Sequence, residues 1–336
     1  MNYRIYGNTG LKVSEICYGT MRYASKDGEM DDRSKAGARA LEEAVDSGVN
    51  FIHSSVEYGT RWLTGEVLGK HPKRHDLHHI IKVNVPDWGE PAFDKEKFRG
   101  QIEDALRELN TDRIAIVQHL HRGTLERELG YCVEGEPKRL SEYEEVTEPL
   151  KEEFARLREE GKVGYLATFP YTVGYARKAV KSGDFSGVVA YFNALETEMF
   201  ELFAEMEAAG MGFIGIRPFA AGLLTDKRVN RNALPDGDRM RDSQFDRFYD
   251  QLEDLRKAIS GEPASWSSFA IRFSLADPRI ASTVVGINSS EQLRETLEAV
   301  EQAAPDAALV RKAQEICSDY RERFGVKGNT AGVPVY

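Results

Sequence analysis

The sequence predicts an α/β protein built as a closed (β/α)8 TIM barrel, and two observations carry this prediction. Short apolar runs of strand length alternate with amphipathic stretches of helix length, and eight such pairs follow an opening hairpin. The apolar runs are continuous, which is typical of parallel strands buried on both faces. In such a barrel the functional groups lie at the carboxyl ends of the strands and in the loops that follow.

The elements follow one another in a simple order. The opening segment predicts a β-hairpin that turns at Asn8-Thr9-Gly10. The predicted barrel strands are Ile16–Gly19, Asn50–His53, His79–Val83, Ile114–Leu120, Val163–Thr168, Val188–Asn193, Gly212–Arg217 and Ser282–Gly286. A helical pattern follows each strand, as between Ser34 and Ser47, where apolar residues recur at spacings of 3 and 4. Because nothing marks a boundary, we interpret residues 1–336 as a single domain.

Two segments are longer than the roughly 2–6 residues of ordinary barrel loops. The stretch from His121 to Leu150 is rich in glutamate and glycine and predicts a lid over the mouth. The stretch from Asn230 to Gln251 is rich in Arg, Asp and Asn and predicts a loop that folds over a ligand. The last helix, about Ala307 to Phe324, and the tail to Tyr336 either reach the mouth or form a structural cap.

Composition narrows the class of partner. The chain has 45 basic and 55 acidic residues, a net charge of −10, which disfavours nucleic acid or an anionic membrane as main partner. No apolar run approaches the ~20 residues that cross a bilayer, and we find no secretory signal, so we expect a cytoplasmic protein. Cys17, Cys132 and Cys317 lack Cys-x-x-Cys spacing and are interpreted as structural. A homo-oligomer is compatible with the sequence.

One tyrosine lies where the barrel predicts chemistry. Residues 48–59 are interpreted as a buried strand that ends in a polar cluster, with Tyr58 just beyond its tip. A phenol, with an ordinary pKa near ~10, is a poor proton donor at neutral pH unless a cation lowers that value. The next strand offers Lys82. The pair predicts acid catalysis at a carbonyl group.

With these residues in place, the chain resembles the aldo-keto reductase family over nearly its whole length. The matching segments, in order, are Gly7–Ser14 with Gly19–Met21, Gly48–Gly59, Gly161–Val163, Arg217–Thr225 and Gly286–Leu293. The resemblance implies hydride transfer, without a metal, between a nicotinamide dinucleotide and a small aldehyde or ketone, or the matching alcohol. The cofactor it implies is usually NADP(H), with NAD(H) also possible.

The resemblance also implies roles for individual residues. Tyr58 would donate the proton, Lys82 would favour its ionisation, and a histidine would orient the carbonyl. A set of strand-end residues would bind the cofactor. These are Gly19, Thr20, Met21, Asn193, Arg217, Pro218, Phe219, Gly222, Leu223, Gly286, Asn288, Ser289 and Gln292. Of these, Ser289 is also suited to cap the helix that follows it.

The choice of histidine depends on strand parity, because side chains two apart on a strand share a face. His119 and His121 flank Leu120 at the end of the fourth barrel strand. If Leu120 points outward, both histidines face the barrel and Gln118 faces the helices. This register matches His121 to the catalytic position, and we favour it.

The chain departs from the family pattern at the catalytic centre. The resemblance predicts an aspartate that pairs with the lysine, and His53 stands in its place. A neutral imidazole secures the charge of Lys82 only weakly. Either Lys82 is less fully charged, or Glu57 supplies the anion from the loop.

Further departures concern the cofactor. Phe169-Pro170, and either Val189 or Ala190, occupy the places of the side chains that hold the nicotinamide carboxamide. Stacking, Arg217 or Asn193 would have to hold the ring instead. There is no basic residue at Asn288 to favour NADP, although Arg294, Lys227 or Arg228 could take that part.

Three functions are compatible with the sequence. The first is a nicotinamide-dependent oxidoreductase acting on a small, polar, sugar-like carbonyl or alcohol. Its polarity is inferred from His53, Glu57, Arg61, Trp62 and Arg122 near the mouth. The second is a reductase-like barrel that binds nucleotide without turnover, as a sensor or subunit. The third is a metal-binding barrel in which His53, His119 and His121 converge.

Overall fold

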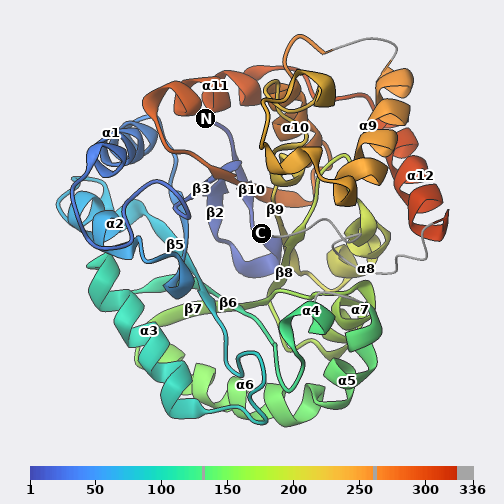
Figure 1. Ribbon diagram of the computed structural model, residues 1–336. Coiled ribbons are helices and arrows are strands. Elements are labelled where there is room, and N and C mark those ends of the chain that lie inside the picture. The colour runs from blue at the N-terminus through green and yellow to red at the C-terminus, as the bar shows by residue number, and fades with distance from the viewer. Residues whose placement is uncertain (131–132, 260–262, 324–336) are drawn as a thin grey trace.

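The computed structural model describes residues 1–130, 133–259 and 263–323. Eight parallel strands close a barrel in the order β10-β3-β4-β5-β6-β7-β8-β9, surrounded by helices (Figure 1). The strands are β3 Ile16–Gly19, β4 Phe51–Ser55, β5 His78–Val83, β6 Ile114–His119, β7 Val163–Thr168, β8 Gly187–Tyr191, β9 Gly212–Ile216 and β10 Ile280–Gly286. The predicted fold is confirmed, and every predicted strand is present.

The helices start and end where the sequence provides caps. The carboxylate of Asp31 accepts a hydrogen bond from the backbone of Ser34 at the start of α1, and Asp94 caps α3 in the same way. The helices are α1 Asp32–Asp46, α2 Arg61–Leu68, α3 Lys95–Leu109, α4 Arg127–Gly130, α5 Glu136–Ser141, α6 Tyr143–Glu159, α7 Val173–Ser182, α8 Phe203–Ala208, α9 Asp246–Ile259, α10 Trp266–Ser274, α11 Ser290–Glu301 and α12 Ala307–Arg323. No described helix is both long and apolar enough to span a bilayer.

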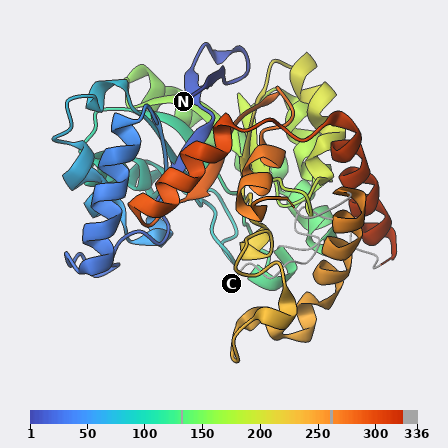
Figure 2. The same ribbon diagram turned by 90° about the horizontal axis from the view of Figure 1, so that it is seen from above.

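The predicted hairpin closes the end of the barrel where the strands begin. Strands β1 (Tyr3–Ile5) and β2 (Lys12–Ser14) pair antiparallel, joined by a turn at residues 7–10. Tyr6 is fully buried, and its ring fills the space where Gly187 and Gly212 have no side chain. Figure 2 shows the hairpin at one end and the gold segment before α9 at the opposite end. The second end is therefore the open mouth.

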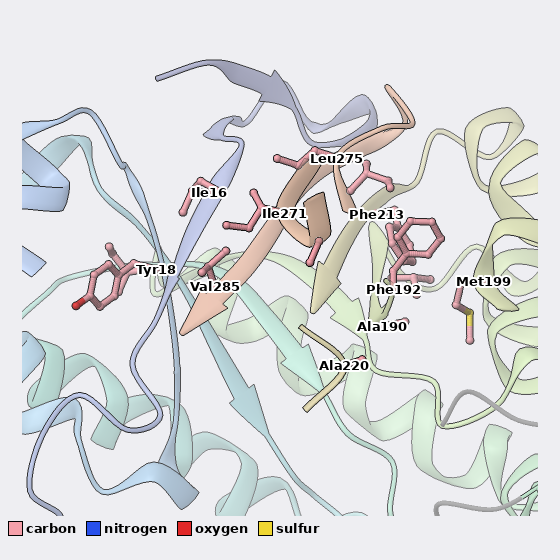
Figure 3. Packing of buried hydrophobic residues seen from close by; sticks show 14 of the residues in the cluster. Ile16, Tyr18, Ala190, Phe192, Met199, Phe213, Ala220, Ile271, Leu275 and Val285 are labelled. Atoms are coloured by element: carbon pink, nitrogen blue, oxygen red, sulfur yellow. The ribbon is translucent and has the colours of Figure 1, made fainter. Parts of the chain in front are cut away.

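The buried apolar residues form two layers. The outer layer lies between the strands and the surrounding helices, and Figure 3 shows part of it, including Ile16, Phe192, Phe213 and Val285. Phe192 and Phe213 pack edge to face, with ring centroids 5.9 Å apart. The inner layer is built from residues of the strands, the hairpin and the loops that follow the strands, with no residue of an α-helix, and it fills the barrel. The layer in which a side chain packs therefore reports whether it faces the barrel interior or the helices.

The long segments are more ordered than plain loops. Residues 121–150 include α4, α5 and the start of α6, while Cys132 lies outside the described residues. Residues 230–251 contain short 3-10 turns before α9 begins at Asp246. Helix α12 packs against α9, where the hydroxyl of Tyr320 donates to the carboxylate of Asp254 at 3.0 Å. The tail to Tyr336 lies outside the described residues.

A pair of helix glycines tests how tightly the helices pack. A Cβ at Gly37 in α1 would overlap the backbone oxygen of Tyr23, whereas a Cβ at Gly100 in α3 meets no atom within 4 Å. Gly37→Ala should lower the free energy of unfolding by about 2–3 kcal/mol, because the clash is with backbone. Gly100→Ala should raise it by about 0.5–1 kcal/mol through helix propensity. Urea unfolding measures both, and equal effects would contradict the packing of α1.

Candidate active site

Three of the four predicted catalytic residues come together at the mouth. Tyr58 ends a 3-10 turn, Val56–Tyr58, directly after β4, and Gly59 leaves the turn with a φ of +64°. The Nζ atom of Lys82 on β5 lies over the Tyr58 ring, 5.2 Å from its centroid. The His53 ring lies with its centroid 6.1 Å from that of Tyr58. A phenol, an ammonium group and an imidazole thus share one site.

The electrostatics of Tyr58 differ from the sequence-based expectation. Its side chain is buried, and burial together with the neighbouring carboxylate of Glu57 raises the pKa of its phenol. The guanidinium groups of Arg122 and Arg61 act in the opposite direction but do not outweigh burial. The predicted acidification of the phenol is therefore not seen. At neutral pH Tyr58 holds its proton.

His53 is a neutral group in this site. Its Nε2 atom lies 3.0 Å from Oε1 of Gln118 on β6, so the two side chains share a hydrogen bond inside the barrel. Burial, and then the charge of Lys82, lower the pKa of His53 to about 3. An uncharged imidazole paired with an amide therefore stands where the resemblance predicted a carboxylate.

The strand parity assumed for β6 is wrong. Ile116, Gln118 and Leu120 face the barrel interior, whereas Val117 packs in the outer layer. His119 faces outward, and its Nε2 lies 2.7 Å from the carbonyl oxygen of Val85. The physical reason is satisfaction of polar groups, because Gln118 finds a partner inside the barrel and His119 finds one outside it.

His121 does not reach the catalytic group. Its ring is fully buried, with Nδ1 3.2 Å from the hydroxyl of Tyr175 on α7 and Nε2 3.6 Å from the carboxylate of Glu142 before α6. The assignment of His121 as the carbonyl-orienting residue is therefore corrected. His53, His119 and His121 do not converge, and within the described residues no cluster of three His, Cys, Asp or Glu could hold a metal ion.

Aromatic rings occupy the part of the mouth where amide-reading groups were expected. The Phe169 ring packs edge to face on Tyr171 and Tyr191, with centroids 4.9 and 5.4 Å apart, and Trp88 lies 5.4 Å from Tyr171. Val189 belongs to the inner layer and Ala190 to the outer one, so Val189 is the residue that faces the interior. This wall is apolar.

The segment after β9 has a strained backbone. Arg217, Ala220 and Ala221 have φ angles of +68°, +46° and +60°, a region that non-glycine residues seldom adopt. The guanidinium of Arg217 lies 4.9 Å from the Tyr191 ring centroid and 3.7 Å from the carboxylate of the buried Glu196. Such strain is typical of loops shaped for a ligand.

Other predicted cofactor residues of this segment differ in their access to a ligand. Gly222 has a φ of +103°, Phe219 is half-buried, and Pro218 and Leu223 are buried. Asn193 is fully buried, and its Nδ2 donates to Glu196 and to the carbonyl of Arg217. Asn193 thus supports the loop and presents no exposed atom to a cofactor, which corrects its predicted role.

The remaining predicted cofactor residues lie at the ends of β3 and β10. The hydroxyl of Thr20 donates to the carbonyl of His53 at 3.0 Å, which ties the loop of Gly19, Thr20 and Met21 to β4. Ser289 caps α11 as predicted by accepting from the backbone N–H of Gln292. The Gln292 side chain turns back to accept from the backbone N–H of Asn288 at 2.8 Å, and Gly286 is exposed at the end of β10.

An arginine cluster at the mouth was only partly foreseen. Burial, and then the charges of Arg228, Arg22 and Arg217, lower the pKa of Arg239, while the carboxylate of Asp238, which pairs with Arg228 at 3.1 Å, acts in the opposite direction. Arg239 also donates to the carbonyl of Ala221 at 3.3 Å. Arg22 and Arg239 were missed. Their positions could have indicated a place at the mouth, because Arg22 follows the first barrel strand and Arg239 lies in the second long loop.

The comparison with known proteins decides the family. A model of the Aldo/keto reductase family matches residues 15–315. The chain belongs to this family. It is an aldo-keto reductase-like oxidoreductase.

Several proteins are similar to this aldo-keto reductase over most of their length. An uncharacterized oxidoreductase, YrpG, of Bacillus subtilis is 28% identical, over 94% of this chain and 96% of its own. L-galactose dehydrogenase of Arabidopsis thaliana is 26% identical, over 88% of this chain and 87% of its own. The holo form of aldo-keto reductase AKR11C1 from Bacillus halodurans shares the fold, with a TM-score of 0.69 and 21% identity over 94% of this chain and 96% of that one.

In this aldo-keto reductase the turn that carries Tyr58 is held by a buried arginine. Arg122, which follows β6, donates to both carboxylate oxygens of Glu57, at 2.8 and 3.0 Å. It also donates to Asp87 at 2.8 Å and to the hydroxyl of Tyr171 at 3.2 Å. Glu57 is thus engaged by Arg122, and this bidentate pair fixes the residue next to the phenol.

Proposed function

We propose that this protein is a nicotinamide-dependent reductase of a small polar aldehyde or ketone, with Tyr58 as the proton donor. The observation that carries the proposal is the Lys82 ammonium group, 5.2 Å from the centroid of the Tyr58 ring at the mouth of the barrel. A protonated phenol beside a fixed cation suits proton transfer to a carbonyl oxygen, because the cation stabilises the negative charge that develops there.

The residues at the mouth are better suited to bind the phosphates of a dinucleotide than its nicotinamide ring. Arg22, Arg217, Arg228 and Arg239 gather at the mouth beside a strained loop, and guanidinium groups bind phosphate oxygens in pairs. A bound NAD(P)H would supply the hydride. The carboxamide of its ring would face Phe169 and Val189 instead of amide side chains, so we propose that packing, with Arg217 nearby, orients the ring.

No histidine of β6 faces the mouth, so the carbonyl must be oriented in another way. We assign that role to Lys82 together with the Tyr58 hydroxyl. His53 and Gln118 form a neutral pair beneath them and hold the lower wall of the site. Neutral partners avoid placing an uncompensated charge in the buried interior.

A polyhydroxylated, sugar-like substrate is the class we favour. One support is the relationship to L-galactose dehydrogenase, which is 26% identical to this chain. The second is the wall of Phe169, Tyr171, Tyr191 and Trp88, because sites for small molecules combine aromatic walls with a few polar groups. Oxidation of NADPH and of NADH, followed with a panel of aldoses and small aldehydes, tests the proposal.

A second candidate is a barrel that binds the dinucleotide without turnover. It is favoured by Leu120, an apolar residue that faces the interior where an orienting histidine was predicted, and by the neutral His53. Quenching of protein fluorescence by NADPH, with no oxidation by any carbonyl of the panel, would support this alternative over the first.

The arginine cluster predicts a charge-dependent affinity for the cofactor. Arg239→Gln should raise the Kd for NADPH about tenfold, because one of four converging guanidinium groups is lost. The exposed Arg107 on α3 provides the control, and Arg107→Gln should leave the Kd unchanged. Fluorescence quenching at constant ionic strength gives both values. Equal affinities for the two variants would exclude the cluster as a phosphate site.

A further inference from the structure

One buried carboxylate has no part in the proposed chemistry. Glu196 ends a tight turn after β8, in which the backbone N–H groups of Asn193 and Glu196 donate to each other's carbonyl oxygens at 3.0 and 3.1 Å. The Glu196 side chain is fully buried. Burying a carboxylate is costly unless a hydrogen bond and a cation compensate for the lost water. The partners of Glu196 therefore indicate what it does.

Two side chains provide this compensation. Oε2 of Glu196 accepts a hydrogen bond from Nδ2 of Asn193 at 2.7 Å, and Oε1 lies 3.7 Å from a terminal nitrogen of Arg217, which follows β9. Burial raises the pKa of Glu196, and the charge of Arg217 and the Asn193 hydrogen bond offset this only in part. Among the described residues, Oε1 of Glu196 and the terminal nitrogens of Arg217 have no hydrogen-bond partner, so the two groups attract each other through charge.

The same turn also fixes the backbone of Arg217. The Nδ2 atom of Asn193 carries two hydrogens, and it also donates to the carbonyl oxygen of Arg217 at 2.9 Å. Arg217 has a strained φ of +68°. Residues 193–196 thus hold Arg217 at two points, its carbonyl through Asn193 and its guanidinium through Glu196.

The guanidinium held in this way lies against the aromatic wall of the mouth. It is 4.9 Å from the ring centroid of Tyr191, and Tyr191 packs edge to face on Phe169 with centroids 5.4 Å apart. The Arg217 side chain is 11% exposed, whereas that of Glu196 has no exposed surface. Glu196 therefore acts on a ligand only through Arg217.

We propose that Glu196 is a positioning residue, which holds the Arg217 guanidinium against Tyr191 and so shapes the wall that receives the nicotinamide ring. Without the carboxylate, Arg217 keeps its charge but loses its counter-ion, and a long cationic side chain then turns its charged end toward solvent. The pairing of the two charges is independent of the proposed function. Its effect on the cofactor rests on that function.

Urea unfolding of the full chain tests the pairing without a cofactor. Glu196→Gln and Arg217→Gln each leave one buried charge without its partner and should lower the urea midpoint by about 1 M. The double variant removes both charges and should recover most of this loss. Losses that simply add in the double variant would show that neither charge depends on the other, and would overturn the inference.

The affinity for NADPH, measured by fluorescence quenching, separates positioning from a purely structural role. Glu196→Gln should raise the Kd about tenfold, Arg217→Gln by a similar factor and the double variant no further, because both changes remove the same contact. A purely structural role predicts instead that affinity returns together with stability in the double variant. That result, or an unchanged Kd in Glu196→Gln, would contradict positioning.

A nearby exposed pair provides the matched control. Glu201 lies on the 3-10 turn Glu198–Leu202 and pairs with Arg177 at 3.1 Å. Glu201→Gln should change neither the urea midpoint nor the Kd, because exposed ion pairs contribute little. Coupled midpoints in a protein that binds neither NADPH nor NADH would support the pairing of Glu196 with Arg217 and would refute the proposed function.

Discussion

Tyr58→Phe is expected to lower kcat by about 10²–10⁴-fold, the range that a positioned proton donor contributes. The phenol lies beside Lys82, and its raised pKa keeps it protonated at neutral pH, so the proposed role requires the Lys82 cation to stabilise the phenolate that remains after the proton is transferred. Removal of one oxygen should leave the buried ring and its packing in place. Steady-state oxidation of NADPH with the best carbonyl of the panel measures the loss, and fluorescence quenching should show unchanged cofactor affinity.

A second buried tyrosine of the mouth provides the matched control. The hydroxyl of Tyr171 accepts a hydrogen bond from Arg122, which in turn holds Glu57. Tyr171→Phe removes this support but not the proposed donor, so we expect less than about a tenfold loss of kcat. If Tyr171→Phe abolished turnover while Tyr58→Phe did not, the proton donor would have been assigned to the wrong phenol.

Acid is expected to destabilise the protein well above the pH at which carboxylates titrate. His53, His79 and His119 are buried, and burial lowers their pKa values to about 3, about 4 and about 3. In the unfolded chain each has a pKa near ~6.5. Below that pH these histidines bind protons in the unfolded state but remain neutral in the native state. The free energy of unfolding therefore falls as the pH falls. The expected loss between about pH 7 and about pH 5 is about 2 kcal/mol per histidine.

Urea unfolding at about pH 7 and about pH 5 measures this loss, which should total about 6 kcal/mol for the three groups. Burial raises the pKa of Glu196, which opposes the trend, but burial also lowers the pKa values of His78 and His121, which add to it. His79→Leu removes a buried titrating ring, so it should reduce the loss by about a third. His75→Gln, on an exposed turn, should not. A stability independent of pH over this window would show that the histidines are protonated or accessible in the native state.

The sequence predicted the barrel well because its signals are local. Continuous apolar runs, helical spacing and the turn at Asn8-Thr9-Gly10 each depend on a few neighbouring residues. Ser289 was also foreseen as a cap, since capping needs only the residue and the helix after it. The pairing of Tyr58 with Lys82 followed from two adjacent strand ends in a parallel barrel.

The parity of β6 could not be predicted in the same way. In a strand buried on both faces, apolar content is similar on each side, so the pattern does not say which face is inside. The answer depended on hydrogen-bond partners far away in the chain, His53 for Gln118 and Val85 for His119. A shift of one residue turned His119 at the end of β6, and His121 after it, away from the barrel interior.

The arginine cluster and the burial of Arg61 have the same origin. Arg22, Arg217, Arg228 and Arg239 are spread along the sequence and act on one another only because the two connections after β3 and β9 meet at the mouth. The sequence placed Arg61 among the polar residues near the mouth, whereas its burial came from the packing of α2 on α3.

By itself, the sequence determined the order of strands and helices, the closed parallel barrel and the presence of Tyr58 and Lys82 at one end of it, because local periodicity and connection length constrain these features. The tertiary structure alone decided which side chains face the interior, which charges gather and which polar groups stay neutral. The reason is that burial and hydrogen-bond pairing act between residues distant in the chain, and these long-range contacts set the protonation of Tyr58 and His53.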